Sequence, residues 1–256
     1  MSNNKKIQCS KCGKWLIPEE SVHSLHNSGE CHVTCLDCAP AGRTISPDEI
    51  KGGRETLENI SKLFANLNMT QHEGRCNFGP ASSNEKIVYG AERPGYDSKR
   101  VALTKVREWI AFMKKQDIKR ICCLLPENQL NYYDGIDLLT LYREKFEEDN
   151  ICWTDIKDWH LCDKDKLLKK ILPFLQESDR KKEKVVVHCS GGSGRTGHVL
   201  AAWLVHRHGL LPYEALLTVK KMEGVNRNPC EAVGKNATRE DLYALLEASK
   251  CSEKDD

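Results

Sequence analysis

The sequence lacks any apolar run near the length of a membrane span, and its start, MSNNKKIQCSKCG, lacks the apolar core of a signal peptide. It also lacks a strong excess of one charge, because 39 Lys and Arg residues face 37 Asp and Glu residues. These absences argue against a membrane-spanning chain, an exported chain and a chain that binds nucleic acid through overall charge. We therefore expect a cytoplasmic protein that has no membrane partner.

The chain does have the length and the apolar content for a substantial core, with 256 residues of which 39% are hydrophobic. These values suit one ordinary domain with a small additional module. The chain also has 13 cysteines, some of them in Cys-x-x-Cys pairs. Without an export signal, this spacing indicates reduced thiols and metal ligation rather than disulfides.

The most informative stretch is VVVHCSGGSGRTG, residues 185–197. Its three valines follow a charged segment and predict a short strand, buried on both faces, that ends at His188. Residues 196–208 predict a helix, because their apolar members recur at helical spacing. The sequence therefore predicts a strand, a tight loop that begins with Cys189, and a helix.

A loop that enters a helix directs unpaired backbone N–H groups and the positive end of the helix dipole toward one point, which makes an anion site. We expect these groups and Arg195 to favour the nucleophilic thiolate form of Cys189. The planar fork of Arg195 suits two oxygens of a tetrahedral oxyanion, and Thr196 can donate a hydrogen bond to the cysteine sulfur. A glycine-rich turn around a structural cysteine is the weaker interpretation. An ATP-binding loop is excluded, because no Gly-Lys-Ser/Thr follows the glycines.

The residues HCSGGSGRTG closely resemble the signature of the cysteine-dependent protein tyrosine and dual-specificity phosphatases: His-Cys, five residues, Arg, then Ser or Thr. The resemblance covers residues 85–249 and is strongest to the compact dual-specificity branch. It implies a phosphocysteine at Cys189, no metal in the chemistry, and catalytic roles for Arg195 and Thr196. It also implies that phosphate is bound by the loop residues Ser190, Gly191, Gly192, Ser193, Gly194 and Arg195.

Cleavage of a phosphate ester also needs a general acid for the leaving oxygen, and aspartates follow the third predicted strand. The phrase Asp155-Ile-Lys-Asp158-Trp-His160 resembles the acid loop of dual-specificity phosphatases, which favours Asp158 as the acid. Asp155 is an alternative, although the family often has proline at its position. Asp163 precedes a predicted helix and is better interpreted as a helix cap.

Strands and helices alternate from residue 85 onward, which predicts an α/β fold with a central, mostly parallel sheet flanked by helices. Ligands of such sheets bind at the carboxyl ends of the strands, where Cys189 is expected. The expected strands cover residues 87–91, 118–125, 151–156 and 185–188, and the expected helices cover 99–116, 136–146, 164–176, 196–208, 210–222 and 238–249.

Residues 1–45 predict a second, smaller module that binds zinc. Cys9 and Cys12 form one Cys-x-x-Cys pair, and Cys35 and Cys38 form another. Four thiolates with no open position describe a structural Zn²⁺ site, which can fold a segment too small to be stable by burial alone. We favour these four ligands, and the module is expected to bind a protein or a nucleic acid, or no partner.

A competing ligand set replaces Cys38 with His32, and its spacing resembles the first zinc site of LIM modules. The cysteine expected after Cys38 in that family is missing. Cys31 is a further possible ligand. Residues 46–84 are expected to form a helix and a linker, and residues 85–256 the phosphatase domain.

Four further features each have a functional and a structural interpretation. Arg227 and Asn228 resemble a loop that folds over the active site, or form a surface turn. The segment Glu92-Arg93-Pro94 lines the cleft or forms a simple turn. His188 is expected to orient the loop rather than to act as the base. The fourth feature is a pair of cysteines that pack in the sheet or supply a resolving thiol for Cys189: Cys122 and Cys123.

The predicted function is hydrolysis of phosphotyrosine, phosphoserine or phosphothreonine in proteins. RNA 5′ ends and phosphoinositides are alternative substrates of the same chemistry. They gain little support from the predicted loop, because residues 190–193 supply no additional cation. A catalytically inactive phosphate-binding adaptor is the alternative of another class, and we rank it lower because every required residue type is present.

Overall fold

The computed structural model describes residues 7–8, 15–16, 21–25, 31–35 and 75–250, and the chain divides into two compact units, Met1–Thr70 and Gln71–Asp256. The first unit contains two antiparallel pairs of short strands. They are β1 (Ile7–Gln8) with β2 (Trp15–Leu16), and β3 (Ser21–Leu25) with β4 (Cys31–Cys35).

The expected zinc ligands Cys9, Cys12 and Cys38 lie outside the described residues. The backbone of Cys35 ends β4. The helix expected within residues 46–74 also lies outside the described residues, so the zinc module and this helix stay predictions.

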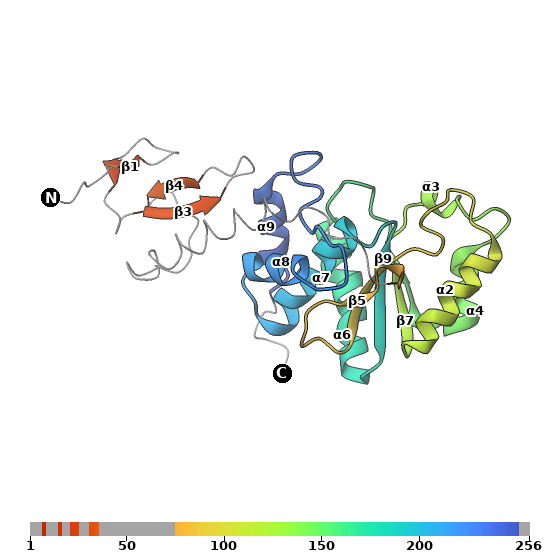
Figure 1. Ribbon diagram of the computed structural model, residues 1–256. Coiled ribbons are helices and arrows are strands. Elements are labelled where there is room, and N and C mark those ends of the chain that lie inside the picture. Colours follow the sequence, from red (N-terminus) through yellow and green to blue (C-terminus); the bar gives the residue numbers. More distant parts are fainter. Residues whose placement is uncertain (1–6, 9–14, 17–20, 26–30, 36–74, 251–256) are drawn as a thin grey trace. The chain divides into compact units, whose positions relative to one another are not determined.

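The second unit is built on a five-stranded sheet in the order β5-β6-β9-β7-β8 (Figure 1). Four of the strands are parallel, and β5 pairs antiparallel with β6, so the predicted α/β class is confirmed with a mixed sheet. Residues 185–187 lie fully buried in the central strand β9, as their β-branched run predicts. The strands are β5 (Gly79–Pro80), β6 (Val88–Glu92), β7 (Ile118–Cys123), β8 (Ile151–Trp153) and β9 (Lys184–Cys189).

Helices cover both faces of this sheet (Figure 1). One face packs against α2 (Leu103–Lys115) and α4 (Leu138–Phe146), and the short helix α3 (Glu127–Leu130) lies between them in the chain. The other face packs against α6 (Leu172–Lys181), α7 (Gly194–His208), α8 (Pro212–Lys220) and α9 (Arg239–Glu247). Short helical segments are η2 (Arg75–Asn77), η3 (Glu148–Asn150), α5 (Lys164–Lys166) and η4 (Leu167–Ile171).

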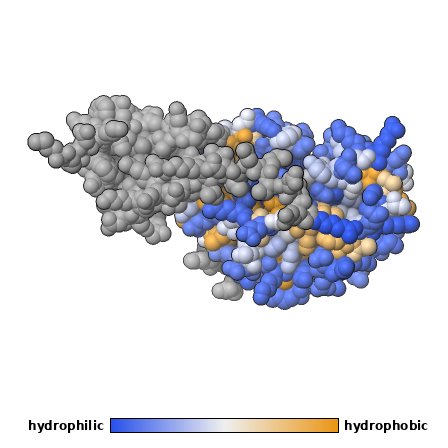
Figure 2. All heavy atoms as spheres, viewed as in Figure 1, coloured by the Kyte–Doolittle hydropathy of each residue, from blue (hydrophilic) through white to orange (hydrophobic). Residues whose placement is uncertain are grey.

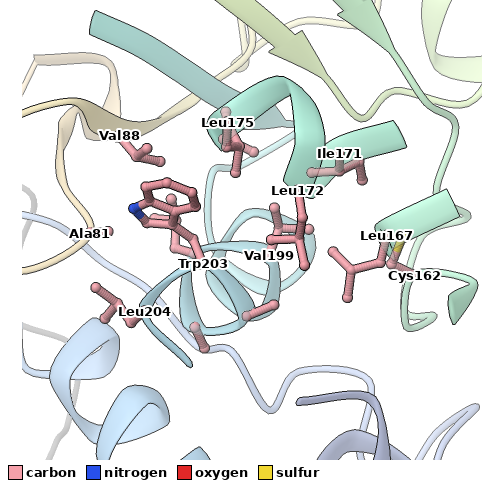
Figure 3. Close-up of a cluster of buried hydrophobic side chains, with 14 of the residues drawn as sticks. Ala81, Val88, Cys162, Leu167, Ile171, Leu172, Leu175, Val199, Trp203 and Leu204 are labelled. Carbon is pink, nitrogen blue, oxygen red and sulfur yellow. The ribbon is translucent and has the colours of Figure 1, made fainter. Parts of the chain in front are cut away.

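Helix α7 is buried along most of its length, because α6, α8 and α9 pack around it on the sheet. Trp203 of α7 is fully buried, and Figure 3 shows its indole between Val88 and Ala81 on one side and helix α6 on the other. The indole N–H donates to the carboxylate of Glu85 at 2.8 Å. A helix held on all sides in this way fixes the position of its N-terminus and of the loop that enters it.

Several predicted elements differ from the structure in their bounds. The helix predicted over residues 164–176 extends to Lys181 and is interrupted by the π-turn η4. Pro173 has no N–H to donate to the carbonyl of Lys169, which favours this irregularity. The strand predicted over residues 151–156 ends at Trp153.

The linker predicted over residues 77–84 is wrong. These residues belong to the second unit, where β5 pairs with β6 and Ala81 packs in the core. Pro and Gly in this segment suggested a linker, but antiparallel pairing at the edge of a sheet also tolerates both residue types.

The surface of the second unit is mostly hydrophilic in the view of Figure 2, with separate orange patches. Among the described residues, no helix is both long and apolar enough to cross a membrane.

Candidate active site

The candidate site lies where β9 ends and α7 begins. Cys189 is the last residue of β9, is 2% exposed, and is followed by a loop of four residues before α7 starts at Gly194. Because β6, β7 and β9 are parallel, their carboxyl ends meet at this edge of the sheet. The predicted strand, loop and helix are therefore confirmed.

Gly192 gives the loop its close packing against the sheet. Its φ is +68°, and a Cβ atom there would lie 2.6 Å from the backbone of Ala91 and 2.7 Å from the backbone nitrogen of Glu92. No other residue type fits this combination of left-handed backbone and backbone contact. The loop is thus pressed onto the end of β6.

Arg93 and Asn77 hold the outer side of the loop. The Arg93 side chain is buried, and its Nε donates to Ser190 Oγ at 3.3 Å while its other nitrogens donate to backbone carbonyls. The Asn77 Nδ2 donates to the carbonyl of Gly191 at 2.8 Å. Arg93 therefore supports the loop from behind. Its buried side chain has a structural role at the site, which a simple turn would not need.

Arg227 lies beneath the loop and is not the exposed turn residue considered from the sequence. It is 2% exposed, and its Nη1 donates to the carbonyl of Gly192 at 3.0 Å. Its Nη2 donates to three more carbonyls, and burial lowers the pKa of Arg227 to about 10. The three carbonyls belong to Asn77, Gly79 and Gly90.

The two serines of the loop direct their hydroxyls to this support. Ser190 Oγ accepts from Arg93, and Ser193 Oγ accepts from the backbone N–H of Asn228 at 3.0 Å. Both hydroxyl oxygens are thereby held by groups outside the loop. The groups of residues 190–194 that are left to bind an oxyanion are their backbone amides.

Arg195 extends from α7 across the ends of the neighbouring strands. Its Nη1 donates to Gln129 Oε1 at 2.9 Å and to the carbonyl of Ile156 at 3.2 Å, so this nitrogen is anchored. Its Nη2 lies 3.0 Å from Asp158 Oδ1. The edge formed by Nε and Nη2 is the one available for bidentate binding of an oxyanion.

The three candidate aspartates occupy different environments. Asp158 is about half exposed and contacts Arg195. Asp155 instead pairs with Lys166 at 2.6 Å, and Asp163 caps α5 by accepting from the Lys166 N–H. Of the three, Asp158 alone is brought to Arg195, and a cleft of about 580 Å³ adjoins it.

Three buried polar side chains surround Cys189 and Arg195. Thr196 Oγ1 is fully buried and has no hydrogen-bond partner within the described part of the chain. His188 lies 3.3 Å from the Tyr142 hydroxyl, and burial lowers its pKa to about 3, so this ring is neutral. His198 accepts from the Cys162 N–H at 3.1 Å, and burial lowers its pKa to about 4. Neither imidazole is placed to act as a base at neutral pH.

The geometry disfavours both cysteines considered as resolving thiols. Cys123 belongs to the core on the α2 side of the sheet, whereas Cys189 belongs to the core on the α7 side. Cys122 is on the same face as Cys189, but its register partner in β9 is Val187, which lies two residues before Cys189 along the strand. Such diagonal neighbours are too far apart for a disulfide without movement of the backbone.

Gln129, Asn77 and Glu231 are residues of the site that the sequence did not reveal. Gln129 lies in α3, just after β7, and its position at a strand end was the available signal. Asn77 comes from the segment interpreted as a helix and a linker, Glu231 follows the possible surface turn at Asn228, and no local pattern connects either residue to Cys189.

The family model described as "Dual specificity phosphatase, catalytic domain" matches residues 103–230, half of the chain. The chain belongs to this family. The match includes Cys189, Arg195 and Asp158, and it identifies the second unit as a phosphatase domain. No curated protein sequence matches the chain.

Solved structures of phosphatases are similar to the chain. PTPMT1 in complex with PI(5)P is 14% identical, with a TM-score of 0.50 over 67% of this chain and 96% of that one, and shares the fold. Tk-PTP in the active form is 25% identical over 66% of this chain and 97% of that one, with a TM-score of 0.48. Kinase associated phosphatase is 20% identical over 64% and 85%, with a TM-score of 0.49.

Proposed function

We propose that the chain hydrolyses phosphate monoesters in two steps through a phosphocysteine at Cys189. The substrates we propose are phosphotyrosine, phosphoserine or phosphothreonine residues of proteins. Membership of the dual-specificity phosphatase family supports phosphatase activity. The observation that carries the proposal is the 3.0 Å contact between Arg195 and Asp158, because it joins the anion loop to a candidate acid.

In the first step, the thiolate of Cys189 attacks phosphorus. A sulfur–phosphorus bond forms, the bond from phosphorus to the leaving oxygen breaks, and Asp158 transfers its proton to that oxygen. The amides of residues 190–195 and the Nε/Nη2 edge of Arg195 bind the remaining oxygens as charge is redistributed. Phosphate thereby replaces Asp158 on Nη2, which frees the carboxyl group for the leaving oxygen.

In the second step, water attacks the phosphorus of the phosphocysteine. Asp158 takes a proton from the water, the sulfur–phosphorus bond breaks, and inorganic phosphate and the thiolate are formed. The buried Thr196 hydroxyl, which has no partner among the described residues, donates a hydrogen bond to the departing sulfur. Thr196 thus stabilises the thiolate as a leaving group.

Asp158→Asn and Asp155→Asn form a matched pair that tests the acid. We expect Asp158→Asn to lower kcat on a phosphate ester with a poor leaving group by about 10²–10⁴-fold. The loss should be much smaller on an ester with a good leaving group, which needs no proton. Asp155→Asn should remain near wild type on both esters. A larger loss in Asp155→Asn would contradict the assignment.

The substrate class is tested by initial rates on phosphotyrosine and phosphoserine peptides, triphosphorylated RNA and phosphoinositides. We expect hydrolysis of the peptides to dominate. Capture from a cell lysate with Asp158→Ala, which retains the nucleophile and the anion loop, should then retrieve phosphorylated proteins. Faster hydrolysis of RNA or lipid than of both peptides would overturn the protein-substrate proposal.

We also propose that Cys9, Cys12, Cys35 and Cys38 hold a structural Zn²⁺ ion. In the sequence, the first pair falls between β1 and β2, and the second begins with the last residue of β4. The Cys-x-x-Cys spacing lets each pair supply two thiolates to one ion. Metal analysis should find one zinc per chain, and Cys38→Ser should release it while His32→Ala retains it. Retention by Cys38→Ser would favour the competing set.

A further inference from the structure

Glu231 is a carboxylate beside the start of α7, where the phosphate loop ends, and neither the signature nor the two-step mechanism uses it. It lies on the segment between α8 and α9 and is half-buried. Its side chain packs directly on Gly194, the first residue of α7. A Cβ atom on Gly194 would collide with the Glu231 carboxylate and lie 2.7 Å from the Glu231 Cβ.

The contact with Gly194 places Glu231 beside the loop, and charged groups of the candidate site act on its carboxylate. Burial raises the pKa of Glu231, and the negative charge of Asp158 raises it further. Lys235, Arg195 and the Gly194 N–H act in the opposite direction and favour the ionised form. Glu231 therefore lies within electrostatic reach of the acid, the anion-binding arginine and the α7 N-terminus at once.

The nearby arginines Arg93 and Arg227 do not present their positive charge to a ligand, so they do not offset the negative charge of Glu231 there. Arg93 and Arg227 are each 2% exposed, and their hydrogen bonds go to backbone carbonyls and Ser190 behind the loop. Lys235 places its ammonium over the ring of Trp159. Among the described residues whose contacts define the loop, Arg195 is thus the cation that faces a bound phosphate.

We propose that Glu231 is a specificity-determining residue that restricts the site to a single phosphate whose neighbours carry no second negative charge. The proposal rests on the phosphatase function proposed above and deepens it. One phosphate is stabilised by the loop amides and Arg195. A second anionic group beside it would meet the negative charge of the Glu231 carboxylate, which Lys235 and Arg195 offset only in part because the pKa of Glu231 stays raised. The substrate class is therefore a singly phosphorylated protein segment, and polyphosphorylated segments and lipid headgroups are disfavoured.

Binding to the Cys189→Ser variant of the full chain tests this proposal without relying on turnover. The probes are two peptides of the same sequence, one with a single phosphotyrosine and one with an additional phosphoserine beside it. A like charge within several Å costs affinity at a protein surface, so we expect the singly phosphorylated peptide to bind about tenfold more tightly. This ratio should shrink as salt is added, because salt screens the repulsion.

Glu231→Gln in the Cys189→Ser background should abolish most of the ratio by strengthening binding of the doubly phosphorylated peptide. Glu144→Gln, which changes an exposed glutamate on α4, is the matched control and should leave the ratio unchanged. Equal affinities for the two peptides before any change at Glu231 would overturn the proposal, whether or not the variant folds. So would an unchanged ratio in a folded Glu231→Gln variant.

Two further outcomes separate this proposal from the proposed function. If neither peptide binds to Cys189→Ser, the phosphate site itself is wrong and both proposals fail. If the active enzyme with Glu231→Gln loses turnover but keeps the wild-type preference between peptides, Glu231 acts in the hydrolytic step. That result would overturn the specificity role and leave the phosphatase function standing.

Discussion

Arg195 and Arg227 are two buried arginines of the same site with different roles. Arg195 is 4% exposed and uses one nitrogen for anchoring to Gln129 and Ile156, while its Nη2 pairs with the half-exposed carboxylate of Asp158. Arg227 is 2% exposed and donates to four backbone carbonyls from three separate segments. One guanidinium faces the chemistry, and the other holds the loop in which the chemistry occurs.

The roles of the two arginines depend on different ranges of the chain. Arg195 stands six residues after Cys189 in one contiguous stretch, and its role follows from that local geometry. Arg227 becomes interpretable only when the fold brings Gly79, Gly90 and Gly192 around it. The reactive groups are local in sequence, and the groups that position them are not.

The same substitution at both arginines gives the largest expected contrast. Arg195→Lys should lower kcat by about 10²–10³-fold, because a single ammonium cannot replace the planar fork on the transferring phosphate. Its unfolding free energy should change much less than that of Arg227→Lys. Steady-state rates on an aryl phosphate, together with urea unfolding of both variants, provide the comparison. Equal losses of activity and stability in the two variants would remove the distinction.

Arg227→Lys should act mainly on stability. A lysine cannot supply the paired donors of Arg227, and each buried carbonyl that loses its donor costs about 1–3 kcal/mol. The unfolding free energy should therefore fall by several kcal/mol, and phosphate affinity should fall with it because Gly192 loses its support. An Arg227→Lys variant as stable as wild type would show that the carbonyl contacts contribute little.

Two glycines with nearly equal φ values separate loop packing from backbone strain. Gly192 has φ +68° and touches the backbone of Ala91, whereas Gly135 has φ +67° and would have nothing within 4 Å of an added Cβ. Gly135→Ala should cost only the left-handed strain, about 1–2 kcal/mol, without loss of activity. Gly192→Ala should also displace the loop and lower kcat/KM. Similar activities in the two variants would contradict the close-packing argument.

The smallest expected effect is a dependence of stability on pH. Burial lowers the pKa of His188 to about 3 and of His198 to about 4, from an ordinary value of 6.5. The unfolded chain therefore binds protons at these sites first as pH falls below about 6.5, which destabilises the fold by up to about 1.4 kcal/mol per pH unit for each histidine. This contribution is fully present above about pH 6.5 and is lost as pH falls toward the folded values.

Urea unfolding at pH 7.5, 6.5 and 5.5, three conditions chosen around the ordinary histidine pKa of about 6.5, measures this slope. His198→Gln should reduce the slope of the unfolding free energy with pH by roughly the contribution of one histidine. An unchanged slope in that variant would mean that His198 is protonated in the folded chain, against its acceptance of the Cys162 N–H.

The fold was largely predictable because its signals are local. The valines of β9 and the apolar periodicity of α7 predict the two elements that position Cys189, and both are confirmed. The short edge strand β5 was not predictable, because Gly79 and Pro80 carry no strand pattern and pair only through the register with β6. Helix α3 is too short for periodicity to reveal.

The candidate site was predictable only in its contiguous part. The signature predicts Cys189, Arg195 and the loop between them, and the spacing after β8 favours Asp158, which the structure places beside Arg195. Asn77 contributes through its contact with Gly191, more than a hundred positions later in the chain. Glu231 contributes through its contact with Gly194, nearly forty positions earlier. No motif encodes such contacts, because many different residues could supply them on the same fold.

The most direct test of the account is detection of the phosphocysteine itself. Purified enzyme is mixed with a phosphotyrosine peptide, quenched in acid within the first turnover, and digested for mass spectrometry. We expect the peptide containing Cys189 to gain the mass of one phosphoryl group, and this adduct to be absent from Cys189→Ser. Turnover of the substrate without a phosphorylated Cys189 peptide, or an adduct on another residue, would contradict it.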